Sequence, residues 1–237
     1  MGRSIEEYDF QKGEILLFDK ELDWTSFDLV RKLRNFLCRE TGIKKLKIGH
    51  AGTLDPKATG LMILCTGKET KNIDLIQAKA KEYVATIKMG ATTPSFDLET
   101  AEDETFSTDH LTPELMKKTL ENFLGEIDQV PPLFSAVKIG GRRAYEHARK
   151  GNDIVLQSRK ITIYELELLK FTKDEIGLKI VCSKGTYIRS LARDLGVALN
   201  CGAYLVGLCR TRIGEMKLED AWEIQDFMEK FQAPATN

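Results

Sequence analysis

Two neighbouring stretches in the second half of the chain alternate apolar and polar residues with a period of two. They read ITIYELELLKF (161–171) and GLKIVCS (177–183), and a short polar segment separates them. Such alternation is typical of strands that bury one face and expose the other. A chain with these strands needs a sheet whose apolar face is covered by other elements.

The rest of the chain adds further strands and a few well-separated helices. Strands are predicted at 14–20, 81–90 and 204–214, and helices at 25–42, 111–125, 184–196 and 218–231. The first helix has Thr25 or Ser26 as its N-cap, and the second has Thr112 as its cap and Gly125 as its stop. This irregular order favours an α+β fold with a mixed, largely antiparallel central sheet and flanking helices. At 237 residues, we expect one domain over 1–237.

The net charge is −1, but the charged residues are unevenly distributed. Residues 31–47 hold seven Lys or Arg against one acid, and residues 137–160 hold seven against two. Residues 97–128 hold ten acids against two bases. This segregation either gives one face a positive field or reflects solvated helix faces and loops. Composition by itself leaves both interpretations open.

The five cysteines contain no Cys-x-x-Cys pair, so we interpret them as reduced thiols and predict no metal site. No cofactor-binding motif is recognised. The N-terminal residues lack the apolar stretch of a signal peptide, and the longest aliphatic run, 61–65, is too short to span a bilayer. These features predict a cytoplasmic protein.

The stretch GHAGTLDPKATG (49–60) combines a histidine, three glycines and an Asp-Pro pair within twelve residues. Asp55 has two interpretations. Aspartate followed by proline is a good start for a helix, with KATGLMIL as the helix or turn beyond it. Alternatively, Asp55 carries out chemistry, and the motif exists to present its carboxylate.

The longer string IGHAGTLDPKATGLMILCTGKETK (48–71) closely resembles the signature of the TruB family of tRNA pseudouridine synthases. Similarity to this family continues in LLFDKELDWTS (16–26), KEYVATIKMG (81–90), VPPLFSAVKIGGRRAYEHARKG (130–151) and CSKGTYIRSLARDLG (182–196). The resemblance runs from about residue 16 to residue 212 and implies the pseudouridine synthase fold. It also implies that 130–151 is an RNA-contacting insertion. The segment 92–100 departs from the family pattern at Pro94, so no role is assigned there.

The resemblance implies three catalytic residues. Asp55 matches the family's essential aspartate, which acts either covalently or as a base at C2′. Arg189 matches the arginine that pairs with this aspartate and opposes the tendency of a buried carboxylate to protonate. Tyr83 matches the tyrosine placed against the target base, where its ring stacks and its hydroxyl serves proton transfer.

Five further residues are implied to contact RNA. His50 matches the residue that fills the space left by a flipped base. Lys20 and Lys138 are expected to contact phosphate or the rim of the active site. Arg142 and Arg143 lie in the insertion, and we expect them to contact the tRNA T arm.

The activity implied is isomerisation of uridine to pseudouridine at position 55 of the tRNA T loop, without cofactor or metal. The expected enzyme is a monomer that needs no guide RNA and no protein partner. No separate C-terminal RNA-binding domain of the PUA type is expected after residue 212. Two alternatives remain open: an RNA-guided pseudouridine synthase, and a non-catalytic RNA-binding or tRNA-folding protein on the same scaffold.

Overall fold

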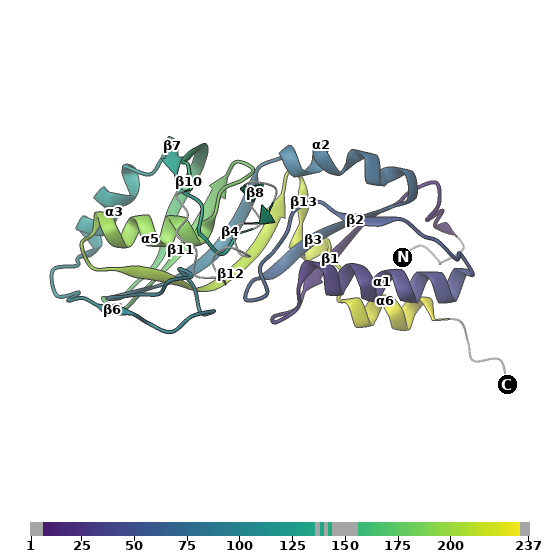
Figure 1. Ribbon diagram of the computed structural model, residues 1–237, viewed down its shortest axis with the longest axis horizontal. Helices are drawn as coiled ribbons and strands as arrows, with labels where there is room; N and C mark the ends of the chain where they lie inside the picture. The colour runs from purple at the N-terminus through teal and green to yellow at the C-terminus, as the bar shows by residue number, and fades with distance from the viewer. Residues whose placement is uncertain (1–6, 136–137, 140–141, 144–155, 233–237) are drawn as a thin grey trace. The chain divides into compact units, whose positions relative to one another are not determined.

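The computed structural model describes residues 7–135, 138–139, 142–143 and 156–232. The chain divides into two compact units (Figure 1). The first unit comprises Met1–Lys81 and Cys209–Asn237, and the second comprises Glu82–Leu208. Each unit is described by itself.

The first unit builds its sheet around strand β3. Its elements are β1 (Ile15–Lys20), α1 (Ser26–Thr41), β2 (Ile48–His50), β3 (Thr59–Thr66), η2 (Gly67–Asn72), α2 (Ile73–Ala78), the end of β12 (Ala203–Ile213), β13 (Met216–Lys217), η3 (Leu218–Asp220) and α6 (Ile224–Phe231). Strands β1 and β2 pair with β3 in antiparallel orientation, and β13 pairs with β12 in the same way. Strand β12 is parallel to β3, with Cys209 opposite Thr59 and Arg210 opposite Gly60.

Helix α1 has the local signals of a well-defined helix at both ends. The Thr25 hydroxyl accepts a hydrogen bond from the Asp28 amide at 3.1 Å, and the Asp28 carboxylate accepts one from the Thr25 amide at 3.1 Å. This reciprocal capping box satisfies two amides that the first turn leaves unpaired. At the other end, Gly42 adopts a left-handed conformation with φ of 71°. The predicted helix is confirmed, with Thr25 as its cap.

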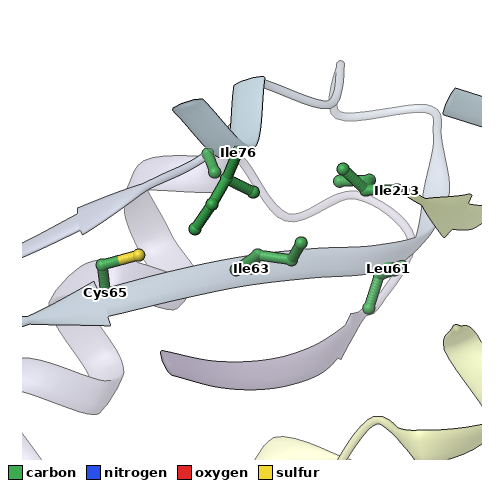
Figure 2. Close-up of a cluster of buried hydrophobic side chains, with 6 residues drawn as sticks. Leu61, Ile63, Cys65, Ile76 and Ile213 are labelled. Atoms are coloured by element: carbon green, nitrogen blue, oxygen red, sulfur yellow. The ribbon is translucent and has the colours of Figure 1, made fainter. Parts of the chain in front are cut away.

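The core of the first unit lies on both faces of β3. Figure 2 shows Ile63 and Cys65 of β3 on the side that faces Ile76 of α2, and Ile213 belongs to the same buried cluster. On the other face, Phe227 of α6 packs edge-on against aromatic rings of β1 and α1. Complete burial of one such aliphatic or phenylalanine side chain contributes about 1.5–3 kcal/mol to the stability of the folded protein. Burial on both faces fixes β3 and therefore the loop that precedes it.

The described residues of the second unit form a sheet, two separate strand pairs and two helices. Its elements are β4 (Lys81–Met89), β5 (Ala91–Thr92), β6 (Glu104–Thr105), α3 (Pro113–Glu121), β7 (Gly125–Gln129), β8 (Lys138–Ile139), β9 (Arg142–Arg143), β10 (Arg159–Phe171), β11 (Glu175–Cys182), α5 (Ile188–Ala198) and the start of β12. The strands are hydrogen-bonded in the order β12-β4-β11-β10-β7. Strand β10 is antiparallel to both β11 and β7, and α3 contacts α5.

These elements confirm the predicted α+β class, with a mixed, largely antiparallel sheet and flanking helices. Some predicted boundaries differ. Helix α3 ends at Glu121, before Gly125, because the Asn122 amide bonds back to the Thr119 carbonyl and tightens the last turn. The C-terminal helix begins at Ile224, after the 3-10 turn η3, instead of at residue 218. None of the helices in the described ranges is long and apolar enough to cross a membrane.

Candidate active site

Asp55 lies in the loop 51–58 between β2 and β3, which we call the Asp55 loop. The Ala58 amide donates to the Asp55 carbonyl at 3.0 Å, which closes a turn around Pro56. Strand β3 follows at once, from Thr59. No helix begins at Asp55, so the helix-capping interpretation is wrong. The reason is tertiary, since residues 59–66 are taken up by pairing with β1, β2 and β12.

Two glycines of the motif are required by the shape of this loop. Gly52 has φ of 111° and Gly60 has φ of 101°, and residues that carry a side chain rarely adopt either backbone conformation. A Cβ at Gly60 would also lie 2.4 Å from the Arg210 carbonyl oxygen. Only glycine therefore admits the backbone of β12 beside the end of the Asp55 loop.

Lys20, at the end of β1, is fully buried beside the Asp55 loop. Its Nζ donates to the carbonyls of Trp24 at 2.7 Å and Glu21 at 2.8 Å, and lies 3.5 Å from that of Pro56. Burial lowers the pKa of Lys20 to about 8, although the negative charge of Asp55 opposes this shift. These hydrogen bonds hold the chain around Asp55, and the expected contact of Lys20 with phosphate or with the rim of the active site stays a prediction.

His50 ends β2, immediately before the Asp55 loop, and is half-buried. Burial lowers its pKa, the charge of Arg210 acts in the same direction, and the backbone of Gly52 acts against them. Its ring is therefore mainly neutral at pH 7. A neutral, partly exposed imidazole is suited to stacking on a nucleobase.

Arg210 was not singled out by the sequence, yet its side chain contacts the Asp55 loop. It is 1% exposed, and its guanidinium donates to the carbonyls of Leu61, Gly52 and Thr53. The sequence signal is weak, because the largely apolar strand YLVGLCRTRIG (204–214) carries two arginines, Arg210 and Arg212. The first unit thus brings together Asp55, His50, Lys20 and Arg210.

In the second unit, Tyr83 lies on β4 and is 8% exposed. The alternation along β4 places Tyr83 on the buried face and Val84 on the exposed face. Tyr83 is therefore held firmly by the sheet. A role against the target base stays a prediction.

Arg189 lies in the first turn of α5 and is 4% exposed, so it is not a surface arginine. It donates to the Phe134 carbonyl at 2.9 Å and to the Ser95 carbonyl at 3.4 Å. Its Nε lies 3.5 Å from the Asp97 carboxylate, which is also buried. The pairing expected between Arg189 and Asp55, which belongs to the other unit, stays a prediction.

Asp97 is the second residue that sequence reasoning missed. It lies in the segment 92–100 and was counted with the acidic stretch 97–128. The Glu99 amide donates to its carboxylate at 2.9 Å, and the Thr93 hydroxyl donates to its carbonyl at 2.8 Å. This local turn aims the carboxylate inward, which a count of charges does not reveal.

The insertion 130–151 is described only in part. Strands β8 and β9 pair in antiparallel orientation, with Lys138 opposite Arg143 and Ile139 opposite Arg142. The side chains of the predicted RNA contacts Lys138, Arg142 and Arg143 lie outside what the structure describes. Their roles stay predictions.

Comparison with known proteins defines the class to which this fold and site belong. Residues 39–188 match the family model of the TruB family pseudouridylate synthase N-terminal domain, and residues 189–235 match that of the tRNA pseudouridylate synthase B C-terminal domain. These matches define a pseudouridine synthase. The chain belongs to the TruB family.

Curated relatives cover nearly the whole chain. A tRNA pseudouridine synthase B from Phocaeicola vulgatus is 56% identical over 221 residues, which is 93% of this chain and 94% of the relative. The protein of the same name from Flavobacterium johnsoniae is 53% identical over 225 residues, with 94% and 98% covered.

Solved structures with the same fold come from larger chains. A chain of a Cbf5-Nop10-Gar1 complex is 27% identical with a TM-score of 0.70, and 96% of this chain is covered. A chain of an H/ACA RNP bound to a substrate RNA containing 2′-deoxyuridine is 25% identical with a TM-score of 0.69. This chain spans 56% and 55% of those chains.

Proposed function

We propose that this protein isomerises uridine 55 in the T loop of tRNA to pseudouridine, with Asp55 acting on the sugar. The observation that carries this proposal is the position of Asp55. Asp55 lies in a loop whose backbone carbonyls contact the buried side chains of Lys20 and Arg210, and whose conformation depends on two glycines. No helix begins at Asp55. Family membership and the name of the curated relatives support tRNA as the substrate.

The reaction rearranges one bond. The N1–C1′ bond breaks, the base turns while bound, and C5 bonds to C1′, after which C5 loses its hydrogen and N1 carries a proton. Asp55 either attacks C1′ or removes the proton from C2′, and both routes need it ionised. No oxidation takes place, so the chain's own residues suffice.

The target base must leave the loop before its glycosidic bond becomes reachable, at a cost of a few kcal/mol. His50 borders the Asp55 loop with a neutral, half-buried ring, which suits it to occupy the space that the base leaves. Tyr83 stacks on the extruded base, and Arg189 supports the ionised carboxylate. Lys138, Arg142 and Arg143 hold the T arm through its phosphates.

The enzyme acts on the T arm alone, as a monomer in the cytoplasm, without guide RNA. The alternative is an RNA-guided mode, because one structure with the same fold is a chain of an H/ACA RNP bound to a substrate RNA. The chain is 56% identical to a tRNA pseudouridine synthase B and 27% identical to the chain of the Cbf5-Nop10-Gar1 complex. The higher identity favours an enzyme that acts without guide RNA.

A tritium-release assay tests this proposal. The substrate is an unmodified T-arm stem-loop with tritium at C5 of its uridines, and the purified protein is the only other component. Formation of the C5–C1′ bond releases one tritium per product into water. We expect release from this stem-loop and none when uridine 55 is replaced by cytidine. Release only after a guide RNA is added would favour the RNA-guided alternative, and binding without release would favour the non-catalytic one.

A further inference from the structure

We propose that Arg210 is a positioning residue for Asp55, and that its buried guanidinium fixes the backbone on both sides of the Asp55 loop. This inference rests on the proposed catalytic role of Asp55. It concerns a residue on β12, about 155 positions away in sequence.

The guanidinium of Arg210 forms a fork whose arms reach different parts of the same segment. Its Nε donates to the Leu61 carbonyl on β3 at 2.8 Å. Its Nη2 donates to the Gly52 carbonyl at 3.1 Å, and its Nη1 reaches the Thr53 carbonyl at 3.4 Å. One planar group therefore ties the start of the Asp55 loop to the strand that follows it.

The backbone of Arg210 holds the end of the same loop. Arg210 is opposite Gly60 in the parallel pair of β12 and β3. The Gly60 amide donates to the Asp19 carboxylate at 3.0 Å, which anchors this end to β1 as well. Asp55 lies between two fixed points, and the Pro56 carbonyl next to it faces Lys20.

The charge of Arg210 also acts on the neighbours of Asp55. It lowers the pKa of both His50 and Lys20, so its field reaches both sides of the loop. The described acceptors of its hydrogen bonds are neutral carbonyls and a thioether sulfur. A buried cation without a carboxylate among these acceptors is costly. The fork geometry and the positive field give this buried cation a role in serving an ionised Asp55.

Three variants separate positioning from simple stability. Arg210→Lys keeps the charge but cannot reproduce the planar fork. Arg212→Lys is the matched control, because it makes the same change two residues along β12, where the guanidinium contacts the Gly214 carbonyl. Phe231→Ala removes core packing in the same unit, where the Phe231 ring contacts the rings of Tyr8, Trp222 and Phe227.

Four quantities are measured for each variant, and the kinetic and exchange measurements are made at a temperature where all variants are folded. They are kcat and KM on the T-arm stem-loop, the melting temperature, and the hydrogen-exchange rate of the Ala58 amide, which bonds to the Asp55 carbonyl. For Arg210→Lys we expect kcat to fall about 100-fold, as displacement of a reacting group by about 1 Å produces, with KM nearly unchanged. Exchange at Ala58 should be faster than in both control variants.

Several results would overturn the inference. They are an unchanged kcat in folded Arg210→Lys, unchanged exchange at Ala58, or an equal loss of kcat in Phe231→Ala at the same loss of melting temperature. The exchange measurement does not depend on catalysis. If the wild-type protein forms no pseudouridine, the proposed function fails, while exchange at Ala58 still decides whether Arg210 holds the loop.

Discussion

The Asp97 carboxylate lies 3.5 Å from Nε of Arg189, and both side chains are about 95% buried. The contact joins the segment after β5 to the first turn of α5 within the second unit. Because two charges are removed from water together, each one depends on the other. The position of Arg189 is therefore tied to a residue in a segment that carried no functional expectation.

Asp97→Asn should destabilise the protein by roughly 1–3 kcal/mol, because it removes a buried negative charge that lies 3.5 Å from Nε of Arg189. Urea unfolding measures this. Glu126→Gln is the control, since it breaks the exposed pair with Lys160, which solvent screens and which should therefore contribute much less to stability. Equal effects of the two variants would contradict the prediction.

Asp55→Asn should abolish pseudouridine formation while T-arm binding survives. A neutral amide can neither attack C1′ nor remove a proton from C2′. Because Asp55 caps no helix, the substitution loses no capping energy, and a decrease in the free energy of unfolding would report the loss of the proposed pair with the buried Arg189. Tritium release, filter binding and urea unfolding check the three parts, and substantial turnover by this variant would refute the catalytic assignment.

The buried ammonium of Lys20 should give the protein a pH-dependent stability. Its pKa is lowered from 10.5 to about 8 in the folded protein, so between these pH values the unfolded chain binds the proton and the folded one does not. The free energy of unfolding therefore gains a contribution that rises with pH from about 8 to 10.5. Urea unfolding at pH 7, 8, 9 and 10 measures the free energy of unfolding of wild type and of Lys20→Met. This contribution should be present in wild type and absent from the variant. Parallel curves would show that the pKa is not lowered.

His50→Ala should reduce kcat/KM by roughly five- to 150-fold, which corresponds to the loss of one stacking contribution of about 1–3 kcal/mol. Asp55 is retained, so activity persists at this lower level. The control substrate has an abasic site next to the target uridine, where less stacking must be replaced and the loss should be smaller. Complete loss of activity on both substrates would assign His50 a chemical role.

Local signals in the sequence determined several elements of this protein. Helix α1 was predicted with Thr25 or Ser26 as its cap, and the structure selects Thr25, whose interactions with Asp28 span only four residues. Strands β10 and β11 were predicted because apolar and polar residues alternate along them, as they do in strands with one buried face. The motif around Asp55 identified the family, and with it the candidate catalytic residue.

Only the tertiary structure decided how that residue is held. The apolar run after Asp55 suits either a helix or a strand, and pairing of β3 with β1 and β12 decides for the strand. Lys20 and Asp97 belong to types that usually lie at the surface, and each is buried because distant segments supply its partners. Arg210 reaches Gly52 across about 158 positions. No local pattern encodes such contacts, because their energy depends on which segments the completed fold brings within hydrogen-bonding distance.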